Sequence, residues 1–191
     1  MTYISLADLK LYLGITTTNE DDLLNDCISA AQKTIETKCG RVFEAAANTT
    51  RNFDAVRDVE GYLLHLDADL CAINSITNGD GLVVSSSNYV TEPRNITPYY
   101  AIRLKANSSV AWTYSSSPED AIAVSGKWAY SVTAPDDIAQ ACKRLAAWLY
   151  RQKDSSQDAD RAIMSASGAV IMPSALPKDV VDLYKPYIRQ N

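Results

Sequence analysis

The sequence contains a single histidine, His65, among its 191 residues. A catalytic histidine needs a nucleophile and an orienting acid beside it. No Gly-x-Ser-x-Gly, His-Glu-x-x-His or Cys–His pattern accompanies this one. Because His65 alternates with Leu64 and Leu66, we expect it on the exposed face of a strand. The sequence therefore predicts no catalytic site and argues against an enzyme.

The cysteines are few and widely spaced: Cys27, Cys39, Cys71 and Cys142 form no Cys-x-x-Cys pair. With one histidine available, they cannot complete a zinc ligand set. Cys27, Cys71 and Cys142 fall in apolar patterns, so we expect them to be small core residues in a reducing compartment. The sequence alone does not exclude a disulfide. We expect no metal and no cofactor.

Three short motifs carry ligand-type residues but have simpler interpretations. Asp67 and Asp69 could bind a cation, although we expect them to cap a turn. Gly79-x-Gly81 lacks the third glycine and the following helix of a phosphate loop, so we expect a hairpin turn. Asp136-Asp137 opens a predicted helix, where acidic side chains stabilise the positive end of the helix dipole.

The chain also lacks an excess of basic charge and any long apolar run. Lys and Arg number 18 against 23 Asp and Glu, a net charge of −5. This balance argues against a protein that grips nucleic acid through phosphates. Trp148, Tyr150, Arg151 and Lys153 could stack on bases, but we expect the edge of a helix core and its solvated face. We expect neither a membrane span nor a signal peptide.

Apolar residues at helical spacing predict a pair of helices in the first forty residues. Ser5, with Asp8 three residues later, predicts the first helix start, and Gly14 its end. Gly40 is expected to end the second helix. The expected buried stripe of that second helix is Leu24, Ile28, Ala31 and Ile35.

The apolar period changes to two between residues 50 and 131, which predicts strands. Asn, Gly, Ser and Pro residues separate these segments and mark turns. We expect a small antiparallel sheet of five or six strands. The expected strands are residues 62–66, 73–77, 82–84, 99–104, 110–114 and 121–128.

A third helix is expected from Pro135, and a short C-terminal helix over residues 177–184. The fold class is therefore α+β: a helical bundle of about three main helices plus the short C-terminal helix, with an inserted small antiparallel β-sheet. The expected divisions are residues 1–49, 50–131, 132–153 and 154–191. The expected stripe of the third helix is Ile138, Cys142, Leu145 and Leu149.

Three segments, in order, resemble the head–tail connector (adaptor) family of long-tailed bacteriophages. The first is Ile4–Ile15, followed by Asp21-Asp22-Leu23-Leu24 and a helix that ends Thr37-Lys38-Cys39-Gly40-Arg41. The second runs from Ile122-Ala123-Val124-Ser125-Gly126-Lys127-Trp128 through Ala134-Pro135-Asp136-Asp137-Ile138 to Leu145–Lys153. The third is Leu176–Tyr187.

The resemblance implies a structural subunit without catalytic residues. It implies a twelve-fold ring of identical subunits beneath the portal protein in the virion neck, assembled in the host cytoplasm. A stopper or tail-terminator protein would bind the far side, and DNA would pass through the bore without specific binding. Another neck or tail-completion protein, or a prophage-encoded binding protein, are the alternatives.

Two C-terminal segments are the expected partner contacts. Aromatic and aliphatic anchors suit an interface core, although packing against the chain's own third helix is the alternative. The portal-contact candidates are Val180, Val181, Leu183, Tyr184 and Tyr187. The neighbour-subunit candidates are Ala169, Val170, Ile171 and Met172, with a strand inside the same subunit as the alternative. The candidate acids for a repulsive bore are Asp54, Asp58, Glu60, Asp67, Asp69 and Asp80.

Overall fold

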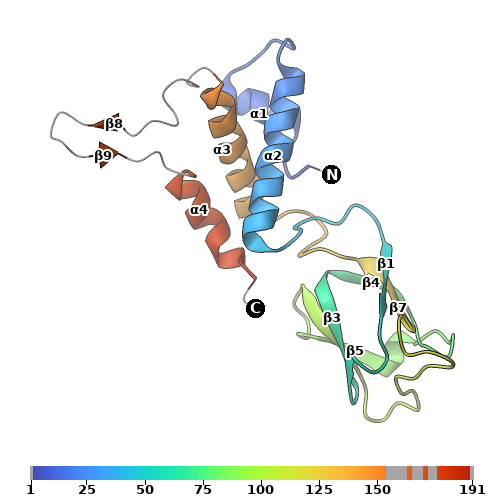
Figure 1. Ribbon diagram of the computed structural model, residues 1–191. Coiled ribbons are helices and arrows are strands. Elements are labelled where there is room, and N and C mark those ends of the chain that lie inside the picture. The colour runs from blue at the N-terminus through green and yellow to red at the C-terminus, as the bar shows by residue number, and fades with distance from the viewer. Residues whose placement is uncertain (1, 154–162, 165–169, 172–175, 190–191) are drawn as a thin grey trace. The chain divides into compact units, whose positions relative to one another are not determined.

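The chain forms two compact units, each of which is described here by itself (Figure 1). The computed structural model describes residues 2–153, 163–164, 170–171 and 176–189. Strands make up the unit of residues 41–134, and the other unit joins residues 2–40 to residues 135–191 and holds the α-helices. The predicted α+β fold with a strand region inserted between helices is confirmed.

The N-terminal helices α1 (Leu6–Leu13) and α2 (Asp21–Cys39) begin and end where local chemistry predicts. The Ser5 hydroxyl accepts from the Asp8 N–H at 3.1 Å, and the Asp8 carboxylate accepts from the Ser5 N–H at 3.3 Å. Gly14 and Gly40 end the helices with φ of 73° and 64°, a conformation that glycine adopts without strain.

Helix α3 (Asp136–Gln152) contacts α1, α2 and α4 (Lys178–Tyr184), as Figure 1 shows for the helices beside it. The predicted stripe is buried at Ile138, Cys142 and Leu145. Burial raises the pKa of the Cys142 thiol to about 12. Because α3 contacts several helices, small residues on α3 allow the backbones of its neighbours to approach closely. The fully buried alanines are Ala141, Ala146 and Ala147.

The strand unit contains two antiparallel sheets, whereas the sequence analysis predicted one. In order, β1 (Thr49–Phe53), β7 (Ile122–Lys127) and β4 (Ala72–Thr77) form the first sheet. The second is β2 (Val59–Glu60), β3 (Leu63–Leu70), β6 (Tyr99–Leu104) and β5 (Tyr89–Glu92). Only Cys71 separates β3 from β4, so one continuous stretch of chain supplies a strand to each sheet. Their shared core includes Phe53, Leu64, Ile76, Ile102, Val124 and Trp128.

Some predicted strands differ from the structure. Segment 82–84 pairs with β4, because Val84 N–H donates to Ile76 at 2.8 Å, which confirms the hairpin. Segment 110–114 is wrong as a strand: within it only Tyr114 forms an isolated bridge, to Gly79. Strands β1, β2 and β5 were missed because they are short and lie at sheet edges.

The segments that lead into and out of the strand unit lie side by side. Tyr130 N–H donates to the Val42 carbonyl at 2.8 Å, and the Ser131 hydroxyl donates to the Phe43 carbonyl at 3.1 Å. Arg41 pairs with Asp69 at 2.8 Å, and both side chains are largely buried. This pairing fixes the first residue of the unit to strand β3.

Gly126 of β7 lies so close to the backbone of Ala72 that no side chain fits at this position. A Cβ at this position would lie 2.3 Å from the Ala72 carbonyl oxygen, and backbone there cannot give way cheaply. We expect Gly126→Ala to lower the free energy of unfolding by about 1–3 kcal/mol. Urea unfolding followed by tryptophan fluorescence measures this. The neighbouring Ser125→Ala variant is the control, and an equal effect of both would contradict the steric argument.

Breaking the Arg41–Asp69 pair should destabilise the strand unit. Arg41→Met leaves a buried carboxylate without its cation, which costs about 3 kcal/mol. The double variant Arg41→Met/Asp69→Leu removes both charges and should recover most of that loss, again by urea unfolding. A double variant as unstable as the single variant would refute the electrostatic explanation.

Candidate interaction surfaces

Among the described residues, no group of His, Cys, Asp and Glu side chains could hold a metal ion. In that same part of the chain, no helix is long and apolar enough to cross a membrane. The side chain of His65 is half exposed and lies 3.6 Å from Glu60. Asp67 and Asp69 lie within β3 and pair with Arg51 and Arg41. The prediction that these two aspartates cap a turn is therefore wrong.

Most of the other acidic bore candidates hold backbone turns. Asp54 accepts from the N–H groups of Val56 and Arg57 at 2.7 and 2.8 Å, bonds that lower the pKa of its carboxyl. Asp58 accepts from the Asp54 N–H at 2.8 Å. The Glu60 side chain, in contrast, is 85% exposed.

The C-terminal portal candidates divide into buried and half-buried residues. Val180 and Tyr184 are 0% and 4% exposed, and α4, which carries them, packs against α3. Val181, Leu183 and Tyr187 are half-buried, so part of each side chain faces outward. For Val180 and Tyr184, the structure thus agrees with the alternative expectation, in which α4 packs against the chain's own third helix.

An ion pair also ties α4 to α3. Asp179 of α4 lies 2.8 Å from Arg144 of α3. The Arg189 N–H donates to the Cys39 carbonyl at 2.9 Å. These contacts hold the C-terminal segment at the end of α2 as well as along α3.

The neighbour-contact candidates lie partly in a short hairpin. Strands β8 (Ile163–Met164) and β9 (Val170–Ile171) pair antiparallel, with Ile163 opposite Ile171 and Met164 opposite Val170. Val170 and Ile171 are therefore paired within the same subunit. Ala169 and Met172 lie outside the described residues.

A polar cluster joins the end of α3 to the start of α2. The Glu20 carboxylate accepts from both the Lys153 ammonium and the Tyr150 hydroxyl. The hydrogen bond from Lys153, followed by that from Tyr150, lowers the pKa of the Glu20 carboxyl. The hydrogen bond to Glu20, followed by that to Tyr150, raises the pKa of the Lys153 ammonium. The sequence analysis expected these α3 residues at a solvated helix edge and did not predict Glu20 as their partner.

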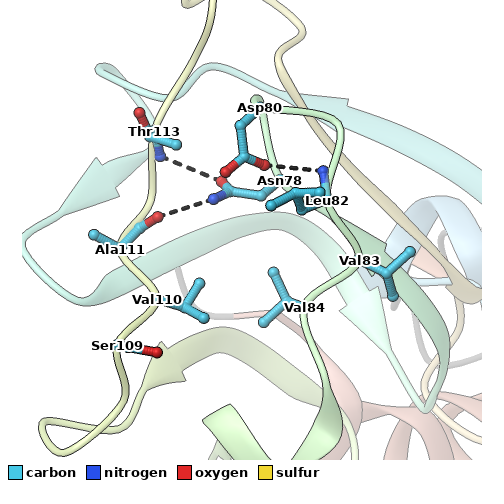
Figure 2. Close-up of a pocket in the computed structure, with 9 residues that line it drawn as sticks. All are labelled: Asn78, Asp80, Leu82, Val83, Val84, Ser109, Val110, Ala111 and Thr113. Atoms are coloured by element: carbon cyan, nitrogen blue, oxygen red, sulfur yellow. Dashed lines mark hydrogen bonds between the residues drawn. The ribbon is translucent and has the colours of Figure 1, made fainter.

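The strand unit has a pocket of about 390 Å³ between the 78–84 turn and segment 109–113 (Figure 2). Asn78, only 2% exposed, donates to the Ala111 carbonyl at 2.9 Å and accepts from the Thr113 N–H at 3.2 Å. Val84 and Val110 face each other across the pocket. The sequence analysis treated this turn only as a hairpin, although Leu82-Val83 directly after it was an available signal.

Both the fold and the sequence of this chain have known counterparts. No curated protein matches the sequence. A chain in the neck of an empty gene transfer agent (GTA) particle, computed with C6 symmetry, has a TM-score of 0.59 and 16% identity, covering 99% of this chain and 91% of that one. A chain in the native GTA virion gives 0.61 and 18%, with the same coverage.

A third similar chain lies in the neck of the native GTA particle, computed with C12 symmetry. Its TM-score is 0.59 at 17% identity, and the match covers 97% of this chain and 88% of that one. At these identities the likeness establishes the fold. The sequence itself matches the head completion protein family over residues 2–189, so the chain belongs to the head completion protein family.

Proposed function

We propose that this chain is a passive building block of a phage-like neck, which acts through its surfaces and turns over no substrate. Identical copies close into a ring of twelve beneath the portal protein. The observation that carries the proposal is the family match over residues 2–189. Structural neighbours in necks computed with C6 and C12 symmetry support a ring.

Portal docking is proposed for the outward part of the C-terminal segment. Val181, Leu183 and Tyr187 keep exposed surface that a partner can cover. Val180 and Tyr184, which are buried, act indirectly by holding α4 against α3. Removing the whole segment would uncover α3, so single surface changes test docking better than truncation does.

A stopper or tail-terminator protein binds the far side of the ring, and DNA passes through the bore. The net charge of −5 supports passage without specific binding, because negative potential repels phosphates. Glu60 is the strongest candidate among the acidic residues for facing DNA, since its carboxylate is exposed. Asp69 is unsuitable because it is buried beside Arg41.

Asp182 offers a direct test of portal docking. It is exposed on α4 between Val181 and Leu183. We expect Asp182→Lys to weaken binding to the portal protein at least tenfold, or about 1.4 kcal/mol, because it reverses a charge within the contact. Biolayer interferometry measures the affinity.

Asp26→Lys on α2 is the matched control, because Asp26 is also an exposed helical aspartate. Unchanged unfolding of both variants by circular dichroism ensures that only docking is compared. Equal portal affinity of Asp182→Lys and the wild-type chain would refute this docking surface.

The ring itself is tested by mixing the purified chain with the portal protein of the same particle. Native mass spectrometry should show twelve added copies per portal, because a closed ring saturates at a fixed number. Graded or absent addition would contradict the ring. If the chain binds only to a preformed neck that lacks a tail-side component, the result would favour the alternative, another neck or tail-completion protein.

A further inference from the structure

We propose that the pocket of Figure 2, in the strand unit, receives the β8–β9 hairpin of a second copy of this chain. The inference rests on the proposed ring and names the surfaces that join its neighbours. The receiving surface is defined by Leu82, Val83, Val84 and Val110. The inserted element is the hairpin of β8 and β9.

The pocket is formed before any partner arrives. Asn78 is buried and bonded to both Ala111 and Thr113, which ties the turn to segment 109–113. Gly79 lets the backbone of the turn approach the backbone of segment 109–113 closely, since a Cβ at this position would lie 2.3 Å from the Thr113 carbonyl oxygen. A surface held in this way loses little conformational freedom on binding, which favours affinity.

The rim of the pocket is apolar and exposed to water. Leu82 and Val83 are 68% and 70% exposed and adjacent, so they form a continuous apolar patch beside the pocket. Asp80 is the charged residue in the lining, and its carboxylate already accepts from the Leu82 N–H at 2.9 Å. The pocket holds roughly a dozen water volumes of about 30 Å³ each. An apolar partner that covers Leu82 and Val83 therefore displaces water from apolar surface, while the exposed Asp80 carboxylate keeps its backbone hydrogen bond.

The hairpin has the complementary chemistry. A two-stranded hairpin with two-residue strands is not stable by itself in water. Its strand positions hold Ile163, Met164, Val170 and Ile171, all of apolar type. Residues 162–177 contain no charged residue, in a chain that is 21% charged. An uncharged segment of apolar residue types matches the apolar part of the pocket, which Leu82, Val83, Val84 and Val110 form.

A second copy is the occupant because a ring needs two different matching surfaces on every subunit. The pocket and the hairpin are different surfaces of one chain. When each subunit receives the hairpin of the next, the contact is head-to-tail and repeats around a closed ring.

Cysteine cross-linking between differently marked subunits tests the pairing. Full-length Val83→Cys and Ile171→Cys chains are mixed in equal amounts, assembled on the portal protein and oxidised. We expect a disulfide-linked dimer on a non-reducing gel, formed in rings and absent from dilute free chains. The native cysteines are buried, and burial raises the pKa of Cys27, Cys71 and Cys142, which slows their oxidation.

The matched control replaces Val83→Cys with Val56→Cys. Val56 is another valine of the strand unit, 62% exposed and outside the pocket. Cross-linking with Val83→Cys at least fivefold above this control supports the inference. If electron microscopy shows rings but the cross-linking does not exceed the control, the inference is overturned and the ring proposal is unaffected.

A chain that carries both Val83→Cys and Ile171→Cys tests whether the hairpin binds the pocket of its own subunit instead of that of a neighbour. Cross-linking within one chain at high dilution would show that the hairpin occupies its own subunit's pocket, which overturns the inference. Failure of the mixture to form any ring would overturn the ring proposal and this inference together.

Discussion

The structure depends on one constraint: a strand unit interrupts a helical unit, so the chain must leave and return at the same place. The hydrogen bonds from Tyr130 to Val42 and from Ser131 to Phe43 bring the two connecting segments together. The buried Arg41–Asp69 pair anchors the first of them to β3. Because the segments meet, α2 and α3 can pack against each other although the entire strand unit separates them in sequence.

This arrangement suits a protein that works as a building block. Helix α3 is buried by several helices at once, so its apolar residues serve the packing of the helical unit. Two surfaces remain available for partners: the outward part of α4 and the pocket of the strand unit. The head–tail connector function inferred from resemblance is confirmed at the level of the family, and the contacts above propose how it is carried out.

The helical parts were predictable from sequence because their signals are local. Ser5 with Asp8, Gly14 and Gly40 fix helix ends through bonds within a few residues. The strand unit was less predictable, since β1 and β5 are short edge strands, and the partner of β1, strand β7, lies far along the chain. The buried state of Asp69 depends on Arg41, and that of Asn78 on residues 111 and 113, so no local pattern reveals either.

The interaction surfaces show the same division. The apolar character of α4 was evident from sequence. Which of its residues are buried, as Val180 and Tyr184 are, and which stay partly exposed depends on tertiary packing. The Leu82-Val83 surface needed the structure, because a turn after Asn78 becomes a pocket only when segment 109–113 lies beside it.

A cryo-electron microscopy reconstruction of the neck of the particle that carries this chain is the most direct measurement. The account predicts a closed ring of copies between portal and tail, each fitting both units described here. Absence of this chain from that position, or its presence only elsewhere in the particle, would contradict the account.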